Sequence, residues 1–279
     1  MSGQALHCER CGRGPALMLL HGYTGSGRSM ERIGRAFQDR YESLAPDLPG
    51  HGGSLAAAGH SFDQSLDDLV ATLEHAGHRR AHWLGYSMGA RLALGCAVRH
   101  PRRVASLVLL AGRAGIADPE ERASRRRADE ALADRLETQG IEAFVDEWLA
   151  QPLFATLRRS GAELLAQERS ARLAHDARGL ATSLRRLGPA AQPPLFDALP
   201  RVHVPVLLVA GALDTRFVAE ARDLARRLPH AEVCVIPEAG HAAHLERPDA
   251  FLRAVDDFLR RVERPASSLP SPAAQEIAS

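Results

Sequence analysis

The sequence predicts an α/β protein with a mostly parallel central sheet flanked by helices. Short, wholly apolar runs such as Ala16–Leu20 and Val104–Leu110 have the composition of strands buried on both faces. Segments in which apolar residues recur with helical spacing, such as Phe62–His75, lie between these runs. Strands that alternate with helices pair in parallel, because each helix returns the chain to the same end of the sheet.

The expected elements follow one another along most of the chain. We expect strands at 8–11, 16–20, 41–48, 81–84, 104–110, 204–211 and 231–236, and helices at 62–75, 90–94, 219–228 and 248–262. Loops rich in glycine, proline and histidine follow several of these strands. In an open parallel sheet such loops form the binding site, because the carboxyl ends of the strands meet at one edge.

The alternation stops between residues 113 and 200, where no strand-like run occurs. Helical stretches dense in arginine, acidic residues and alanine are expected at 119–139, 141–149, 162–173 and 179–187. We interpret 113–200 as an all-helical cap inserted into an α/β core made of 1–112 and 201–264. The Pro/Ser/Ala-rich tail at 265–279 has the composition of a disordered segment.

The composition is ordinary for a globular chain and excludes several kinds of function. The net charge is +1, so we expect no binding to nucleic acid. All 35 basic residues are arginine, which excludes Schiff-base chemistry on a lysine and a P-loop. Cys8 and Cys11 lack a second pair of ligands, so we expect no metal and no cofactor. With no long apolar run and no signal-peptide pattern, we expect no membrane segment and a cytoplasmic protein, most simply a monomer.

Residues 85–89, Gly-Tyr-Ser-Met-Gly, match the G-x-S-x-G pattern of a nucleophile elbow. The pattern lies between an apolar strand and an Ala/Leu-rich helix, which places Ser87 at the apex of a sharp turn. The flanking glycines allow neighbouring backbones to pass close to that turn. An ordinary strand-to-helix turn with a capping serine is the alternative.

Two further residues complete a possible triad with Ser87. Asp214 follows the apolar strand at 204–211, and His241 follows the strand at 231–236. The chain order Ser, Asp, His is that of α/β-hydrolases. A serine hydroxyl needs an imidazole to take its proton, and the imidazole needs a carboxylate to fix its tautomer. The three residues together predict an α/β-hydrolase fold with a catalytic triad.

Other residues remain open as alternatives to members of this triad. His244 lies three residues after His241 and is a second candidate for the base. Glu238 and Asp223 are weaker candidates for the acid. His21 is expected to form hydrogen bonds within its own loop rather than to act in catalysis.

The loop after the first buried strand reads His-Gly-Tyr-Thr-Gly-Ser-Gly at 21–27. In an α/β-hydrolase this loop supplies one backbone N–H of the oxyanion hole, here that of Tyr23. The second is the N–H of Met88, directly after the nucleophile.

Arg91 is the unusual residue of the elbow helix. It follows Ser87 by four, so it lies on the same helix face, one turn along. An arginine there suggests an anionic substrate that the guanidinium binds with two parallel hydrogen bonds. A buried structural ion pair is the alternative.

These segments together resemble the MenH family, the 2-succinyl-6-hydroxy-2,4-cyclohexadiene-1-carboxylate synthases of menaquinone biosynthesis. The matching segments are Leu-His-Gly-Tyr-Thr-Gly-Ser-Gly at 20–27, Gly-Tyr-Ser-Met-Gly-Ala-Arg-Leu-Ala-Leu at 85–94, Glu-Arg-Ala-Ser-Arg at 121–125 with Asp129, Trp-Leu-Ala-Gln-Pro-Leu-Phe at 148–154, and Gly-His-Ala-Ala-His-Leu-Glu at 240–246. The resemblance runs from about residue 17 to 258. The triad segments identify only the superfamily, whereas Arg91 and 148–154 point to this family. Ala90 departs from it, because a second glycine is usual there.

The resemblance implies a lyase that acts on a small polycarboxylate. The triad would make Ser87 a general base that removes a ring proton, after which pyruvate leaves. The resemblance also implies that cap arginines, best matched by Arg125 and Arg172, bind the substrate. Tyr86 and Trp148 would be pocket walls, with core packing as the alternative. A carboxylesterase or a carbon–carbon bond hydrolase on the same fold remains the alternative function, and a non-catalytic binding protein is a third.

Overall fold

The computed structural model describes residues 3–264, and within them seven strands form one sheet. The strand order is β1-β3-β2-β4-β5-β6-β7, with β1 antiparallel to β3 and the other neighbours parallel. The strands are β1 (Cys8–Gly12), β2 (Ala16–Leu20), β3 (Glu42–Pro46), β4 (Ala81–Tyr86), β5 (Val104–Leu110), β6 (Val206–Gly211) and β7 (Ala231–Ile236). This mostly parallel sheet confirms the predicted fold class.

Helices connect these strands. They are α1 (Glu31–Phe37), α2 (Phe62–His75), α3 (Met88–Arg99), α4 (Pro119–Ala150), α5 (Ala162–Leu173), α6 (Ala177–Leu187), α7 (Thr215–Arg227), α8 (Ala243–Glu246) and α9 (Pro248–Glu263). Short 3-10 helices lie at Gly27–Met30, Leu55–Ala57, Pro101–Arg103, Pro152–Phe154, Leu157–Arg159 and Phe196–Arg201. Within the described residues, no helix has both the length and the apolar character needed to cross a membrane.

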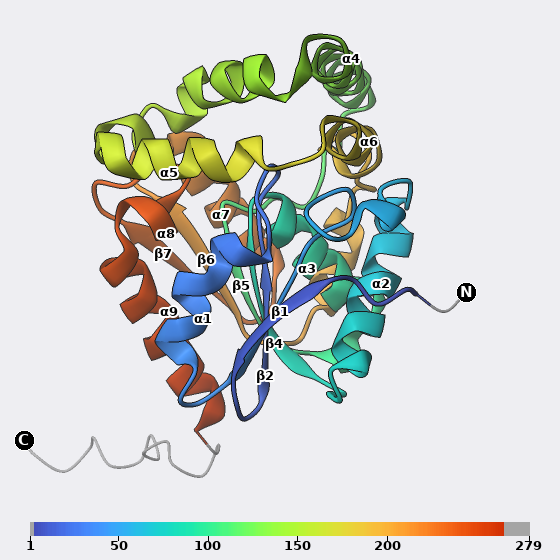
Figure 1. Cartoon of the computed structure of the whole chain (residues 1–279). Helices are drawn as coiled ribbons and strands as arrows, with labels where there is room; N and C mark the ends of the chain where they lie inside the picture. Colours follow the sequence, from blue (N-terminus) through green and yellow to red (C-terminus); the bar gives the residue numbers. More distant parts are fainter. Residues whose placement is uncertain (1–2, 265–279) are drawn as a thin grey trace, which may run out of the picture.

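The two faces of the sheet build two apolar clusters. Helices α2, α3 and α7 pack on one face, and α1 and α9 pack on the other (Figure 1). Strand β2 shows why its sequence is apolar throughout: Met18 and Leu20 belong to the first cluster, whereas Leu17 and Leu19 belong to the second. All four side chains are fully buried. A strand covered on both faces has no solvent-facing position for a polar residue.

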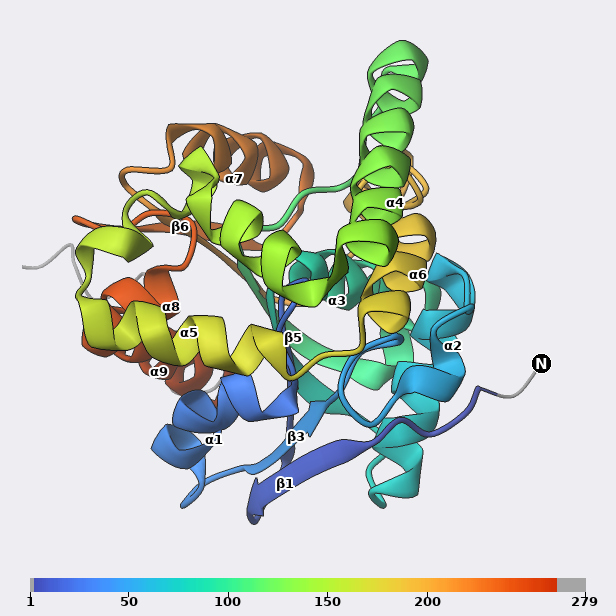
Figure 2. The ribbon, with the colours of Figure 1, turned by 45° about the horizontal axis from the view of Figure 1, so that its top comes forward.

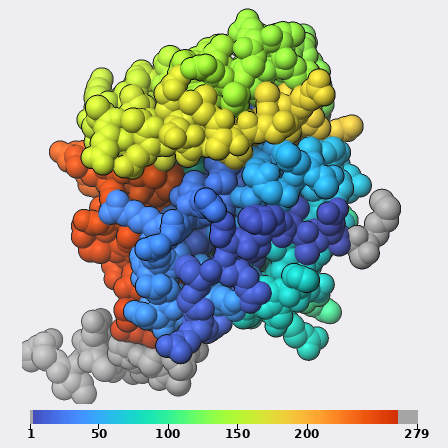
Figure 3. All heavy atoms as spheres, viewed as in Figure 1, coloured from blue at the N-terminus to red at the C-terminus, as the bar shows by residue number. Residues whose placement is uncertain are grey.

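The segment between β5 and β6 forms a separate helical layer. Helices α4, α5 and α6 lie across one end of the sheet (Figures 1 and 2), and their atoms form a continuous band in the space-filling view (Figure 3). Buried residues of α4 and α6 make a third apolar cluster, against which Tyr23 of the core packs. We propose that residues 113–200 are the cap of this molecule.

Some elements differ from the sequence-based expectations. Helix α4 extends from Pro119 to Ala150 as one element, but Gly140 has φ 84° and kinks it at the point where the sequence predicts a break between two helices. Helix α7 begins at Thr215 rather than 219, because the Asp214 side chain accepts a hydrogen bond from the N–H of Phe217. Helix α1 is not among the predicted elements. The prediction for 265–279 lies outside the described residues.

Candidate active site

The chain between β4 and α3 turns sharply at Ser87. This residue has φ 52° and ψ −105°, a conformation that a non-glycine residue rarely adopts. Its N–H donates to the carbonyl of Leu110 on β5 at 2.8 Å, which anchors the turn to the sheet. A Cβ on Gly85 would lie 2.3 Å from the Gly89 oxygen, and one on Gly89 would lie 2.2 Å from the Leu20 oxygen. The two glycines are therefore required by backbone contact.

The structure brings Ser87, His241 and Asp214 together. His241 Nε2 lies 3.2 Å from Ser87 Oγ, and His241 Nδ1 lies 2.8 Å from Asp214 Oδ2. With the carboxylate accepting from Nδ1–H, Nε2 is free to accept the serine proton. The His241 side chain is 2% exposed, so this arrangement is shielded from water. The geometry is that of a serine, base and acid in hydrogen-bond contact.

The alternative residues lie in other surroundings. Glu238 forms an ion pair with Arg247 on the surface, and Asp223 pairs with the α7 arginines. His244 is buried beside Tyr86, with ring centroids 4.5 Å apart, and burial lowers its pKa to about 3. A histidine that stays neutral to such low pH is a weak base.

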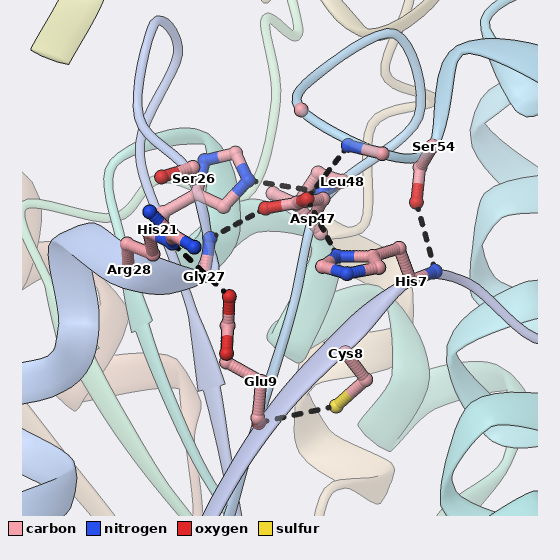
Figure 4. A network of polar contacts seen from close by, with 12 residues as sticks. His7, Cys8, Glu9, His21, Ser26, Gly27, Arg28, Asp47, Leu48 and Ser54 are labelled. Atoms are coloured by element: carbon pink, nitrogen blue, oxygen red, sulfur yellow. Dashed lines mark hydrogen bonds and ion pairs between the residues drawn. The ribbon is translucent and has the colours of Figure 1, made fainter.

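His21 forms hydrogen bonds within its loop and with a neighbouring loop, as expected. Its Nδ1 contacts the Gly22 oxygen at 2.7 Å, and its Nε2 accepts from the Leu48 N–H at 2.9 Å. Burial lowers the pKa of His21 to about 3. Asp47 accepts from the N–H of Gly27 at 2.7 Å and completes a network between the loops after β2 and β3 (Figure 4). This network fixes the loop that carries Tyr23.

The two residues of the predicted oxyanion hole lie beside Ser87. A Cβ on Gly22 would lie 3.6 Å from Ser87 Cβ, which puts the Gly22–Tyr23 peptide next to the nucleophile. Tyr23 and Met88 both line the cavity above the serine. Among the described residues, neither backbone N–H donates to another protein group. The Tyr23 hydroxyl donates to the Leu180 oxygen of α6 at 3.0 Å and so ties this loop to the cap.

Comparison with known proteins agrees with this geometry. The family model described as alpha/beta hydrolase fold matches residues 15–248. The 2-succinyl-6-hydroxy-2,4-cyclohexadiene-1-carboxylate synthase of Escherichia coli O1:K1 / APEC is 34% identical over 246 residues, which cover 88% of this chain and 94% of the relative. The structure of MenH from S. aureus is 30% identical with a TM-score of 0.89, covering 92% of this chain and 99% of the other.

The chain belongs to the MenH family. A thermophilic esterase from Thermogutta terrifontis, solved with malate bound, is also similar, at 28% identity and a TM-score of 0.82, with 92% of this chain and 94% of that chain covered. Enzymes other than the synthases therefore share this fold. The residues around the nucleophile, rather than the fold, must determine whether elimination or ester hydrolysis occurs.

In this MenH-family chain, one cavity joins the nucleophile to most of the residues proposed for substrate binding. The predicted residues that line it are Tyr23, Tyr86, Ser87, Met88, Arg91, Arg125, Trp148 and His241. The cap contributes further apolar wall through Phe154 and Leu184, and the core contributes Phe217. No cluster of metal-binding side chains occurs among the residues that the structure describes.

Arg91 lies in this cavity without a carboxylate partner among residues 3–264. Its guanidinium donates to the Leu187 oxygen at 2.7 Å and contacts the Gly188 oxygen at 3.5 Å and Gln192 Oε1 at 3.4 Å. All three partners are neutral, so the alternative of a buried structural ion pair does not describe this site. Burial lowers the pKa of Arg91 to about 9, an effect that nearby Arg125 increases.

The two cap arginines lie in different places. Arg125 lines the cavity and donates from Nε to Asp129 at 2.7 Å. Arg172, the other arginine expected to bind the substrate, does not line this cavity. It is buried on the other side of Tyr86, in a small cavity with His175 and His244, and forms an ion pair with Glu168 at 2.5 Å. The helical register of α5 places its side chain there.

Sequence reasoning missed Glu246, which holds the loop carrying His241. One carboxylate oxygen accepts from the Gly240 N–H at 2.7 Å and the other from the Ala242 N–H at 3.2 Å. These residues flank His241 on both sides. The cap also contacts this loop, because a Cβ on Gly240 would lie 2.0 Å from Thr156 Oγ1.

Proposed function

We propose that this protein eliminates pyruvate from 2-succinyl-5-enolpyruvyl-6-hydroxy-3-cyclohexene-1-carboxylate. The product would be 2-succinyl-6-hydroxy-2,4-cyclohexadiene-1-carboxylate, an intermediate of menaquinone biosynthesis. The observation that carries the proposal is the shared cavity: Ser87 and an arginine without a carboxylate partner, Arg91, line the same space. Ester hydrolysis requires the serine but does not itself require a buried cation, whereas an enzyme that binds three carboxylates gains from one.

In the proposed mechanism, Ser87 acts as a base rather than as a nucleophile. His241 takes the hydroxyl proton while Asp214 holds the imidazole in the required tautomer. The serine oxygen then removes the ring proton alpha to the succinyl carbonyl, and the electron pair moves into that carbonyl to form an enolate. No acyl-enzyme forms in this step.

The enolate oxygen would accept hydrogen bonds from the N–H groups of Tyr23 and Met88, which stabilise negative charge as it develops. Collapse of the enolate breaks the carbon–oxygen bond to the enolpyruvyl group and creates the second ring double bond. Enolpyruvate leaves, takes up a proton that returns from His241, and tautomerises to pyruvate. Ser87 keeps the proton that it removed from the ring and His241 is neutral again, so the enzyme is unchanged and no cofactor is consumed.

Binding of the substrate is proposed to involve Arg91 and Arg125, with Tyr86 and Trp148 as walls. Each of these side chains lines the cavity. The Trp148 Nε1–H is buried and has no hydrogen-bond partner among the described residues, so it can donate to a bound oxygen. We further propose that the enzyme acts in the cytoplasm as a monomer.

Pyruvate release tests the proposal directly. The substrate is generated in place from the preceding reaction, and release is compared for wild type and Ser87→Ala. We expect fast release by wild type, and release at the spontaneous rate in the variant. A carboxylesterase is the second candidate, because the esterase with malate bound shares the fold at 28% identity. Rapid turnover of an activated ester through an acyl-Ser87 intermediate, with pyruvate release at background, would favour the esterase.

A further inference from the structure

Two arginines that the sequence analysis did not select line the cavity together with Ser87. Arg113 follows β5 closely, and Arg216 is the second residue of α7. Arg216 comes from the core, Arg113 is the first residue of the proposed cap segment, and Arg125 comes from cap helix α4. With Arg91, the cavity therefore contains four guanidinium groups.

Protein carboxylates lie within ion-pair distance of two of these four arginines, Arg125 and Arg113. Arg125 has a close partner in Asp129. Arg113 lies 3.8 Å from Glu121 and 3.6 Å from Glu220, too far for a hydrogen bond to either. Among residues 3–264, Arg216 makes no ion pair or side-chain hydrogen bond, and it lies at the exposed mouth of the cavity.

Arg113 is repelled by the other three arginines, and Arg91 is also repelled by Arg125. Burial lowers the pKa of Arg113; Glu220 and Glu121 raise it, and the charges of Arg216 and Arg125 lower it. Arg125 and Arg113 also lower the pKa of Arg91, whereas Asp129 raises it. The arginines are thus close enough to interact across the cavity. Such an arrangement is stabilised when an anion enters, because each new anion relieves repulsion as well as forming its own contacts.

We propose that Arg113 and Arg216 form a second anion subsite, which holds a carboxylate of the substrate remote from the reacting carbon. The inference rests on the proposed function and extends it: the enzyme selects molecules with at least two carboxylates, one at Arg91 and Arg125 and another at Arg113 and Arg216. The second subsite thus combines a residue of core helix α7 with the first residue of the cap segment.

The experiment compares Arg113→Gln, Arg216→Gln and the double variant with wild type. Arg222→Gln is the matched control, since Arg222 is an exposed residue of the same helix, α7, and does not line the cavity. Two quantities are measured: the affinity for citrate, a tricarboxylate probe, by calorimetry, and kcat and KM for pyruvate release. Circular dichroism and thermal unfolding establish that each variant is folded.

We expect each single substitution to weaken citrate binding and raise KM by about tenfold, and the double substitution by about a hundredfold. The kcat should change little, because a remote carboxylate is held equally in the ground state and in the transition state. Arg222→Gln should match wild type. Citrate that does not bind wild type, or binds the double variant equally well with an unchanged KM, would overturn the subsite.

The two proposals fail in different ways. Pyruvate release by wild type with no effect of the double substitution refutes the subsite and leaves the lyase in place. Citrate binding that depends on Arg113 and Arg216, without pyruvate release above background, supports the subsite and refutes the lyase.

Discussion

Replacing Arg91 by methionine separates its contribution to stability from its contribution to turnover. Methionine has a similar length and leaves no charge in the buried site. The arginine makes one short hydrogen bond, 2.7 Å to the Leu187 oxygen, and two contacts of 3.4 and 3.5 Å that are at the limit for a hydrogen bond. Its 6% exposure means that burying the cation has already cost free energy.

The effect on folding should therefore be small. Loss of one charge-assisted hydrogen bond costs about 1.5–3 kcal/mol, and removal of a buried cation that lacks a carboxylate partner offsets part of that cost. We expect the free energy of unfolding to change by less than about 2 kcal/mol. The effect on turnover should be larger. A substrate carboxylate left without its buried partner costs about 2–5 kcal/mol, or roughly 30- to 5,000-fold in kcat/KM.

The assay couples pyruvate release to lactate dehydrogenase and records kcat/KM, while urea unfolding records stability. Arg222→Met on the surface of α7 is the control and should match wild type in both measurements. A folded Arg91→Met enzyme with wild-type kcat/KM would refute the reasoning, because it would show that the substrate places no negative charge at this guanidinium.

Two further predictions concern the His241 loop and acid stability. Glu246→Gln leaves one acceptor oxygen for two N–H groups, so kcat should fall about tenfold, with KM unchanged and the pH profile of kcat displaced. The control Glu232→Gln, at an exposed residue of β7, should change neither kcat nor the pH profile. An unaltered kcat in Glu246→Gln would contradict the positioning role of Glu246. Burial holds the pKa of His244 at about 3 against an ordinary 6.5, so the unfolded chain binds a proton first as pH falls, and stability is lost progressively below pH 6.5. Between pH 7 and 5, the free energy of unfolding measured in urea should fall less steeply with pH for His244→Gln than for wild type. A replacement of the exposed His203 should leave this pH dependence unchanged. Equal pH dependence for His244→Gln and wild type would contradict the low pKa assigned to His244.

The triad can be predicted from the sequence because the position of all three residues relative to the strands follows the same rule. Ser87, Asp214 and His241 each follow a buried strand, and the carboxyl ends of parallel strands meet at one edge of the sheet. The same rule applies to Arg113, which follows β5, but the signal is hidden among 35 arginines. The position of Arg216 is harder to predict, because it depends on where α7 starts, and that start depends on the side-chain cap by Asp214.

Other parts of the site depend on three-dimensional contacts that cannot be inferred from a local sequence pattern. Glu246 acts through the N–H groups of a turn, and a glutamate near the end of a short helix looks like an ordinary surface residue. The resemblance implies that Arg172 binds the substrate, but it does not fix the rotation of α5, which decides the side of Tyr86 that the guanidinium reaches. Short α1 escapes prediction because its seven residues contain few apolar positions to establish a period.

The contact between Thr156 and Gly240 links two segments that are distant in the chain and differ in origin, one from the cap and one from the loop of the base. With a Cβ at position 240 only 2.0 Å from Thr156 Oγ1, a larger residue can be accepted there only if position 156 becomes smaller or its segment shifts. Substitutions in the two segments are therefore expected to accumulate in pairs among related chains. A cap exchanged from a relative should work best when the residues around position 240 are transferred with it.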